Sequence, residues 1–157
     1  MQEKRLSVFK IRHALAEILA VANSVTVVLG ELEKIIGYDS TYKRYRRIMN
    51  QFVNQGEFIQ QSSYRYKLTC KGAIKLLPVI QPHLAKDGNI RILVFDIPET
   101  KRGVRNQFRN RIKMLDFRLH QRSVWVSRYD CEKWLAKIVE YYQLQGCVAL
   151  YIGKRAI

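Results

Sequence analysis

The stretch that decides the fold is STYKRYRRIMNQFVNQGEFIQQSSYRYKLT, residues 40–69. Its first half has a helical period, with one packing side made of Thr41, Tyr45, Ile48 and Phe52. Asp39 or Ser40 can cap the start of this helix, and Gly56 is a natural end for it. After Gly56 the pattern alternates, which predicts a two-stranded hairpin over residues 57–69.

The opposite side of the predicted helix is cationic and polar. It carries Tyr42, Lys43, Arg46, Arg47 and Asn50. In a helix-turn-helix, one side of the recognition helix packs inward while its exposed residues meet base edges in the major groove. Arginine can bind guanine in a bidentate manner, and Lys, Arg or a tyrosine hydroxyl can contact phosphate. We expect these five residues to bind DNA, and the alternative is a solvated basic face.

The predicted hairpin has its own cationic side. Alternation puts Arg65 and Lys67 on one face and the apolar set on the other, namely Phe58, Tyr64, Tyr66 and Leu68. A short ribbon beside a recognition helix suits phosphate contacts, so Arg65 and Lys67 are expected to bind the DNA backbone. The alternative is a pair of solvated cations on an edge strand, where charge resists aggregation.

The flanking segments complete a known arrangement. Helical spacing predicts helices over residues 5–22 and 27–36, the second ending at Gly37, and a closing helix over 71–80 that Pro78 would end or kink. Three helices, a hairpin and a further helix make a winged helix-turn-helix. We assign it to residues 1–85.

The second half alternates strands and helices. The predicted order is a strand at 90–97, a helix at 100–115, strands at 117–121 and 123–128, a helix at 131–144 and a strand at 147–152. A βαββαβ order is typical of a ferredoxin-like domain. The turn residues within 81–89 mark the boundary, so this domain is assigned to residues 86–157. The fold class is therefore α+β.

A second basic helix lies in this half. Its inner side is apolar, with Val104, Phe108, Ile112 and Leu115. Its outer ridge carries Arg102, Arg105, Arg109 and Lys113. We expect this ridge to neutralise DNA phosphates, and the alternative is again solvation.

Two motifs in the second half point to a family. They are VFDIPE at residues 94–99 and LDFRLHQRSVWVSRYDC at residues 115–131. Residues 90–152 resemble the middle domain of PaaX-type transcriptional repressors, which is related to the small ferredoxin-like subunit of CRISPR adaptation complexes. The resemblance implies a homodimer through the ferredoxin-like domains. PaaX-type repressors continue into a C-terminal domain that we expect this chain to lack, which leaves any small-molecule effector open.

The relation to the CRISPR subunit singles out Asp96. It ends the predicted strand where that subunit has an aspartate proposed to hold a divalent metal across a two-fold axis. The resemblance thus implies an alternative, a Mg²⁺- or Mn²⁺-dependent endonuclease or adaptation-complex scaffold in which Asp96 is catalytic and binds metal. The competing interpretation is that Asp96 caps a turn before Pro98 or pairs with Arg102 or Arg105. Asp130 is expected to be the N-cap of the helix at 131–144.

Composition limits the classes of partner that the protein is expected to bind. The 157 residues include 28 Lys and Arg against 13 Asp and Glu, a net charge of +15, which favours a polyanion. No apolar run is long enough to span a bilayer, and the start lacks the pattern of a signal peptide, so we expect a cytoplasmic protein without a membrane partner. The leading hypothesis is a dimeric, sequence-specific binder of double-stranded DNA, a repressor that needs no cofactor for binding. A membrane-surface binder is the third hypothesis.

Overall fold

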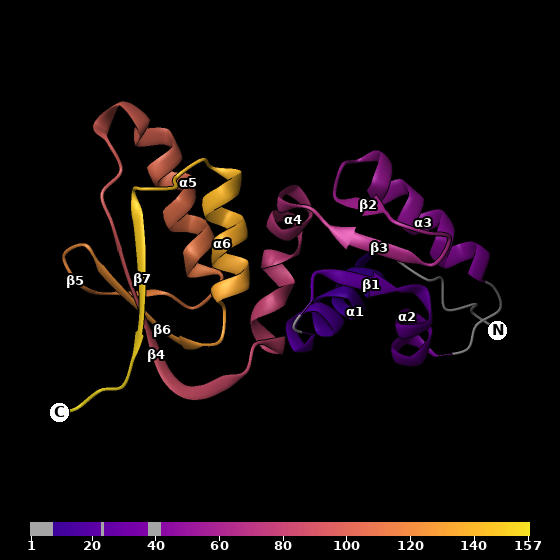
Figure 1. Ribbon diagram of the computed structural model, residues 1–157, viewed down its shortest axis with the longest axis horizontal. Helices are drawn as coiled ribbons and strands as arrows, with labels where there is room; N and C mark the ends of the chain where they lie inside the picture. Colours follow the sequence, from indigo (N-terminus) through magenta and orange to yellow (C-terminus); the bar gives the residue numbers. More distant parts are fainter. Residues whose placement is uncertain (1–7, 23, 38–41) are drawn as a thin grey trace. The chain divides into compact units, whose positions relative to one another are not determined.

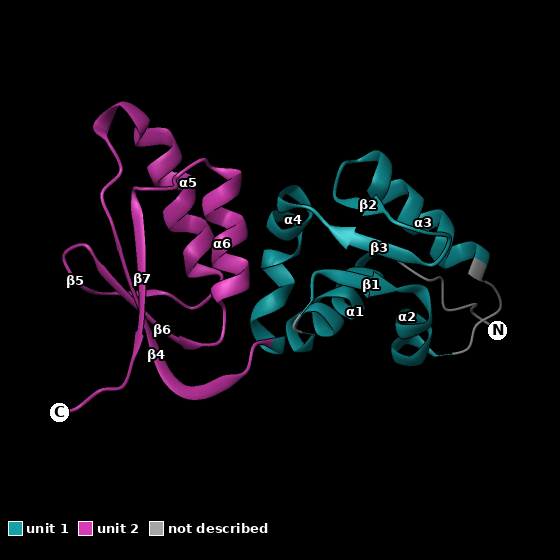
Figure 2. Ribbon diagram, in the orientation of Figure 1, with its two compact units in different colours: residues 1–83 teal, residues 84–157 magenta. Residues whose placement is uncertain are grey.

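The computed structural model describes residues 8–22, 24–37 and 42–157. The chain divides into two compact units, Met1–His83 and Leu84–Ile157 (Figure 2). Helices and strands alternate in both, so the α+β class predicted from the sequence is confirmed. Each unit has its own sheet and its own core.

The first unit is a winged helix-turn-helix (Figure 1). Its elements are α1 (Val8–Val21), β1 (Thr26–Val28), α2 (Leu29–Ile36), α3 (Tyr42–Asn54), β2 (Phe58–Gln60), β3 (Arg65–Leu68) and α4 (Cys70–Ile80). The strands form a small antiparallel sheet in the order β1-β3-β2. The predicted caps Asp39 and Ser40 lie outside the described residues.

One local prediction in this unit was wrong, and of the two effects expected of Pro78 the ending of the helix does not occur. Residues 26–28 form a strand where the sequence pattern predicted a helix from residue 27, because Thr-Val-Val is β-branched throughout and Val27 is buried opposite Tyr66 of β3. Helix α4 does not end at Pro78 but continues to Ile80. Pro78 lies on the exposed side of α4, and burial of the leucines and isoleucine around it holds the last turn in place.

Gly72 fixes how closely α4 approaches the hairpin. A Cβ atom at this position would lie 2.0 Å from the carbonyl oxygen of Glu57 and 2.8 Å from a methyl carbon of Leu68. Only glycine allows the start of α4 to contact the backbone there. Thr69 caps the same helix, because its hydroxyl oxygen accepts the N–H of Gly72 at 3.0 Å. The helix that follows the wing is therefore held against the turn that precedes it.

The second unit is ferredoxin-like (Figure 1). Its elements are β4 (Lys86–Phe95), α5 (Arg102–Lys113), β5 (Arg118–Gln121), β6 (Val124–Tyr129), α6 (Glu132–Tyr141) and β7 (Val148–Gly153). The sheet is antiparallel with the order β5-β6-β4-β7, as the predicted βαββαβ order requires. Helices α5 and α6 lie on one face of the sheet, where Phe108 of α5 meets Phe95 of β4 at a ring distance of 5.1 Å.

The start of β4 departs from the sequence pattern. Asp87-Gly88-Asn89 was predicted as a turn between domains, yet it lies inside the strand, and the units divide between His83 and Leu84. The register with β6 shows why. Lys86 lies opposite Tyr129, and Arg91 lies opposite Ser127. Because β4 has more residues between these two pairs than β6 has, β4 arches away from β6 as a bulge. Gly88, with φ +82°, supplies the left-handed residue that this bulge needs.

Candidate nucleic-acid interface

Helix α3 has the two sides that its sequence predicted. Its buried side is formed by Tyr45, Met49 and Phe52, of which Met49 was not predicted. Its other side borders a shallow surface hollow, lined by Lys43, Arg46, Arg47, Asn50, Gln51, Asn54 and Gln55. Lys43, Arg47 and Asn50 are exposed there, and the side chain of Tyr42 lies outside what the structure describes. This side of α3 combines cations with side-chain amides, the groups that hydrogen-bond phosphates and bases.

Arg46 differs from its neighbours on α3. The sequence placed it on the outer side, but it is half-buried, and its guanidinium carbon lies 5.4 Å from the centre of the Tyr64 ring. Burial raises the pKa of the adjacent Tyr66 hydroxyl, and the positive charge of Arg46 partly offsets this rise. Arg46 thus lies against two tyrosines of the hairpin. A cation over an aromatic face is attractive, so Arg46 joins α3 to the wing.

The hairpin, which we call the wing, spans β2, β3 and the loop between them. Arg65 and Lys67 are exposed while Tyr66 and Leu68 are buried, as the alternation predicted. The prediction for Tyr64 was wrong: it precedes β3 and is exposed, because its ring contacts Arg46 on the surface. Strand β3 is also not an edge strand, since it pairs with β1 and β2. Protection of a free edge therefore does not explain its two cations.

An ion pair joins α1 to the turn before the wing. Glu57, at the turn from α3 to β2, is almost fully buried, and its carboxylate pairs with Arg12 of α1 at 2.8 Å. The Arg12 guanidinium also lies 4.6 Å from the centre of the Phe52 ring. Helical spacing gave no signal for this pair, since 45 residues separate its members. It ties α1, α3 and the start of the wing together.

The ridge on α5 is less uniform than its sequence suggested. Arg102, Arg109 and Lys113 are exposed. Arg105 is half-buried and pairs with Glu99 at 2.9 Å, so a carboxylate of the same unit already neutralises much of its charge. Arg105 is therefore less available to a DNA phosphate than the other three cations of the ridge.

Asp96 stands apart from the cations that were offered as its partners. It follows the last residue of β4, its side chain is exposed, and its backbone N–H donates to the carbonyl oxygen of Cys147 at 2.9 Å. Arg105 pairs with Glu99 instead. A single carboxylate is a poor Mg²⁺ site, and no group of three or more His, Cys, Asp or Glu comes together among the described residues. The part of one chain that the structure describes therefore brings no second ligand group to Asp96, and the endonuclease alternative needs a symmetry-related copy to supply it.

The charged group that the sequence did not reveal is centred on Arg91 of β4. This side chain is 2 % exposed and pairs with Asp87 within the bulge and with Glu132 of α6 at 2.8 Å, while Asp130 lies 3.7 Å away. Helix α6 begins after Cys131, so the prediction of Asp130 as its N-cap was wrong. Asp130 belongs to the Arg91 cluster instead, because the positive charge of Arg91 attracts its carboxylate. Arg91 interrupts the apolar run of residues 90–95 within β4, which is the one signal that could have marked it.

Acid–base properties of the cluster follow from these contacts. Hydrogen bonds from the Arg91 guanidinium and the Asn89 backbone hold the pKa of Asp87 well below its usual range. A hydrogen bond with Glu132 raises the pKa of Asp130. For Glu132, burial acts to raise the pKa, but the hydrogen bonds with Arg91 and Asp130 outweigh it and lower the value. The cluster is a structural clamp on the β4 bulge.

Comparison with known proteins supports the family resemblance. Residues 84–156 match the family model described as the PaaX protein central Cas2-like domain. The match spans nearly the whole second unit and extends beyond the residues on which the resemblance was first based. It supports a PaaX-like family. No curated protein and no solved structure matches the chain. Within the described residues, no helix has the length and apolar character needed to cross a membrane.

Proposed function

We propose that the protein is a transcription regulator that binds a specific sequence of double-stranded DNA, and that it acts as a repressor. One observation carries the proposal: Lys43, Arg47 and Asn50 are exposed on α3 of a winged helix-turn-helix fold. In this fold the exposed side of the second helix of the motif enters the major groove. The match to the PaaX central domain adds support, since that family name belongs to regulators.

The residues have different roles in this proposal. Arg47 and Asn50 meet base edges, because arginine can bind guanine and asparagine can bind adenine in a bidentate manner. Lys43 contacts bases or adjacent phosphates near the start of α3. Arg46 positions the wing against α3 through Tyr64 rather than reading a base. Arg65 and Lys67 then contact phosphate on the flank of the groove.

The second unit has cations that contact the DNA backbone in this proposal. It also has a surface to which a second copy of the chain binds. Arg102, Arg109 and Lys113 contact phosphates, as their exposure allows. The sheet face away from α5 and α6 has an apolar centre, where Ile92 of β4 lies opposite Val126 of β6 and Tyr151 of β7. Tyr151 is 60 % exposed. We propose that two copies pair through this face, so that two winged units bind two half-sites.

The proposal is tested by selecting bound fragments from random duplex DNA with the full chain. We expect enrichment of a sequence with two half-sites related by two-fold symmetry, about 10 base pairs or a multiple of that apart. Binding of the enriched sequence should exceed binding of a scrambled duplex by at least about 1,000-fold at physiological salt. A steep salt dependence without any enriched sequence would contradict the proposal, because it would leave only phosphate binding.

A further inference from the structure

The two halves of α3 carry different chemical groups. The first two turns carry the cations of the helix, whereas the last two turns carry three exposed side-chain amides, Asn50, Gln51 and Asn54. No Asp or Glu occurs within Tyr42–Asn54. The proposed function gives a role to Asn50 but none to Gln51 and Asn54, so most of the last two turns is unexplained.

The spacing of these residues suits the major groove of DNA. Counted from Arg47, the amides follow at the third, fourth and seventh positions, so the four side chains form one stripe along the helix. All four are exposed and line the same hollow. In the homeodomain, four side chains of the recognition helix contact bases at this same spacing. Seven residues of helix rise about 10 Å, which is about three steps between base pairs.

The amides are free to bind a partner outside the protein. No side-chain hydrogen bond joins Asn50, Gln51 or Asn54 to another residue in the parts of the chain that the structure describes. Asparagine is a poor helix former, because its side chain competes for backbone hydrogen bonds. Two exposed asparagines therefore weaken α3 and gain no contact in return. A local rule broken without a structural gain is expected at a functional site.

The last turn of α3 is held in a fixed position. Gly56 has φ +75°, and its N–H donates to the carbonyl oxygen of Val53 at 2.9 Å. The N–H of Glu57 donates to the carbonyl oxygen of Phe52, also at 2.9 Å, which completes a Schellman end. The Glu57 carboxylate in turn pairs with Arg12 of α1. The amides of this turn thus project from a rigid support, which lowers the entropy cost of ordering them on a partner.

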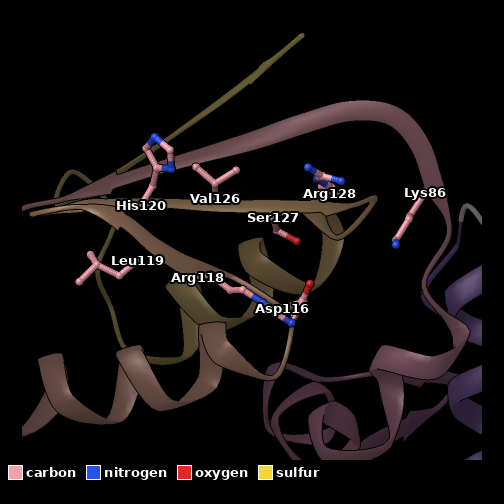
Figure 3. Close-up of a pocket in the computed structure, with 8 residues that line it drawn as sticks. All are labelled: Lys86, Asp116, Arg118, Leu119, His120, Val126, Ser127 and Arg128. Atoms are coloured by element: carbon pink, nitrogen blue, oxygen red, sulfur yellow. Dashed lines mark hydrogen bonds and ion pairs between the residues drawn. The ribbon is translucent and has the colours of Figure 1, made fainter. Parts of the chain in front are cut away.

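The charge around the stripe also favours DNA. Among the described residues that line the hollow on α3, none is acidic. A hollow on the second unit shows the contrast, because there Asp116 lies among the cations and pairs with Arg118 at 3.0 Å (Figure 3). On α3, exposed Lys43 and Arg47 are therefore available to attract a duplex. The amides, which are uncharged, then add selectivity rather than attraction.

We propose that Gln51 and Asn54 determine DNA specificity together with Arg47 and Asn50. The half-site that α3 reads then consists of one G·C pair followed by A·T pairs, within about four consecutive base pairs. Arginine binds guanine in a bidentate manner, and both asparagine and glutamine bind adenine in this way. The inference rests on the proposed function, since it names the sequence that the same helix recognises. The amides could instead contact phosphates, an outcome that the test below separates.

The test repeats the selection from random duplex DNA with the full chain and with the variant Gln51→Ala/Asn54→Ala. The parent protein should enrich a guanine with A·T pairs beside it, whereas the variant should keep the guanine and lose the A·T preference at the far end. In titrations, replacing one of those far A·T pairs by G·C should weaken binding by the parent protein at least about fivefold. The same replacement should change binding by the variant less than about twofold.

The matched control is Gln107→Ala/Asn110→Ala, which removes the same two amides from exposed positions of α5. It should keep the preference of the parent protein. Alanine favours helix formation, so both double variants should fold. An A·T preference that persists in Gln51→Ala/Asn54→Ala would overturn this inference and leave the proposed function intact. Equal weakening on every duplex would assign the amides to phosphates and overturn it as well. A parent protein that enriches no sequence would overturn the proposed function and this inference with it.

Discussion

The two basic helices, α3 and α5, each have one cationic side but different surroundings. Exposed Lys43, Arg47 and Asn50 border one surface on α3, and Arg46 lies over the ring of Tyr64 in the wing. On α5, Arg105 pairs with Glu99 at 2.9 Å. A helix with one cationic side therefore carries exposed cations in one unit and a partly neutralised ridge in the other. The sequence of a helix alone does not distinguish these two cases, because the difference depends on which side chains of neighbouring elements contact the cations.

Two arginines that pair with carboxylates extend this comparison. Among the described residues, Arg12 of the first unit pairs with Glu57, whereas Arg91 of the second unit is surrounded by Asp87, Asp130 and Glu132. A positive residue counted in the net charge can thus serve stability rather than binding. If the comparison is correct, substitutions at Arg91 change folding, and substitutions on α3 change DNA recognition.

The largest expected effect is on stability. Arg91→Met should lower the free energy of unfolding of the second unit by about 3 kcal/mol, at the low end for a broken buried ion pair because the carboxylates left behind are partly exposed. Both tryptophans, Trp125 and Trp134, lie in this unit, so their fluorescence during urea unfolding reports on it alone. The control Arg105→Met breaks a more exposed pair and should cost at most about 1 kcal/mol. Equal costs for the two variants would contradict the central role of Arg91.

Acid should weaken the same cluster. Asp87 and Glu132 have lower pKa values in the folded protein than in the unfolded chain, so their stabilisation is complete above the usual carboxylate range. It is lost as the pH falls below about 4, while the raised pKa of Asp130 acts in the opposite direction. Tryptophan fluorescence followed from about pH 7 to about pH 2 should show the second unit unfolding in this range. The Arg91→Met variant should show a shallower dependence, and an unchanged slope in that variant would argue against the cluster as the cause.

The wing should strengthen binding to all DNA sequences equally. Arg65→Gln/Lys67→Gln should weaken binding to every duplex alike and reduce the slope of log K against log salt by about 2, or about 0.9 for each phosphate that is no longer neutralised. Titrations of a selected and a scrambled duplex at several salt concentrations measure this. A reduction confined to the selected duplex would mean that the wing reads bases.

A smaller effect is expected at Tyr64. Tyr64→Ala removes the aromatic partner of Arg46, an interaction worth about 0.5–1 kcal/mol at an exposed site. We expect about a threefold loss of affinity for the selected duplex, because the wing is then less firmly held against α3. Tyr64→Phe keeps the ring and should retain the affinity. Identical losses in both variants would point to the hydroxyl instead of the ring.

Much of the fold follows from local sequence patterns. The change from helical period to alternation at Gly56 predicted α3 and the wing, and the βαββαβ order predicted the antiparallel sheet of the second unit. The predictions failed where a distant partner decides the outcome. Thr26–Val28 becomes a strand because it pairs with β3, and Asp87-Gly88-Asn89 becomes a bulge because β4 pairs with β6 on both sides of it.

The features of the candidate site also divide into those that a local sequence pattern predicts and those that depend on distant residues. Exposure of Lys43, Arg47 and Asn50 follows from helical geometry, which a single segment contains. The half-buried position of Arg46 depends on Tyr64, which lies 18 positions further along the chain, and the neutralisation of Arg105 depends on the path of the chain after β4. Gln51 and Asn54 continue the exposed side of α3, so helical geometry alone could also have marked them.

The most direct test of the central claim compares Arg47→Ala on α3 with Arg109→Ala on α5. The quantity measured is the ratio of affinities for the selected and the scrambled duplex at one fixed salt concentration. Arg47→Ala should lower this ratio by a factor of about 5–150, the equivalent of about 1–3 kcal/mol of discrimination, while Arg109→Ala lowers both affinities and leaves the ratio unchanged. A ratio that stays constant in Arg47→Ala, or that falls equally in both variants, would contradict the account.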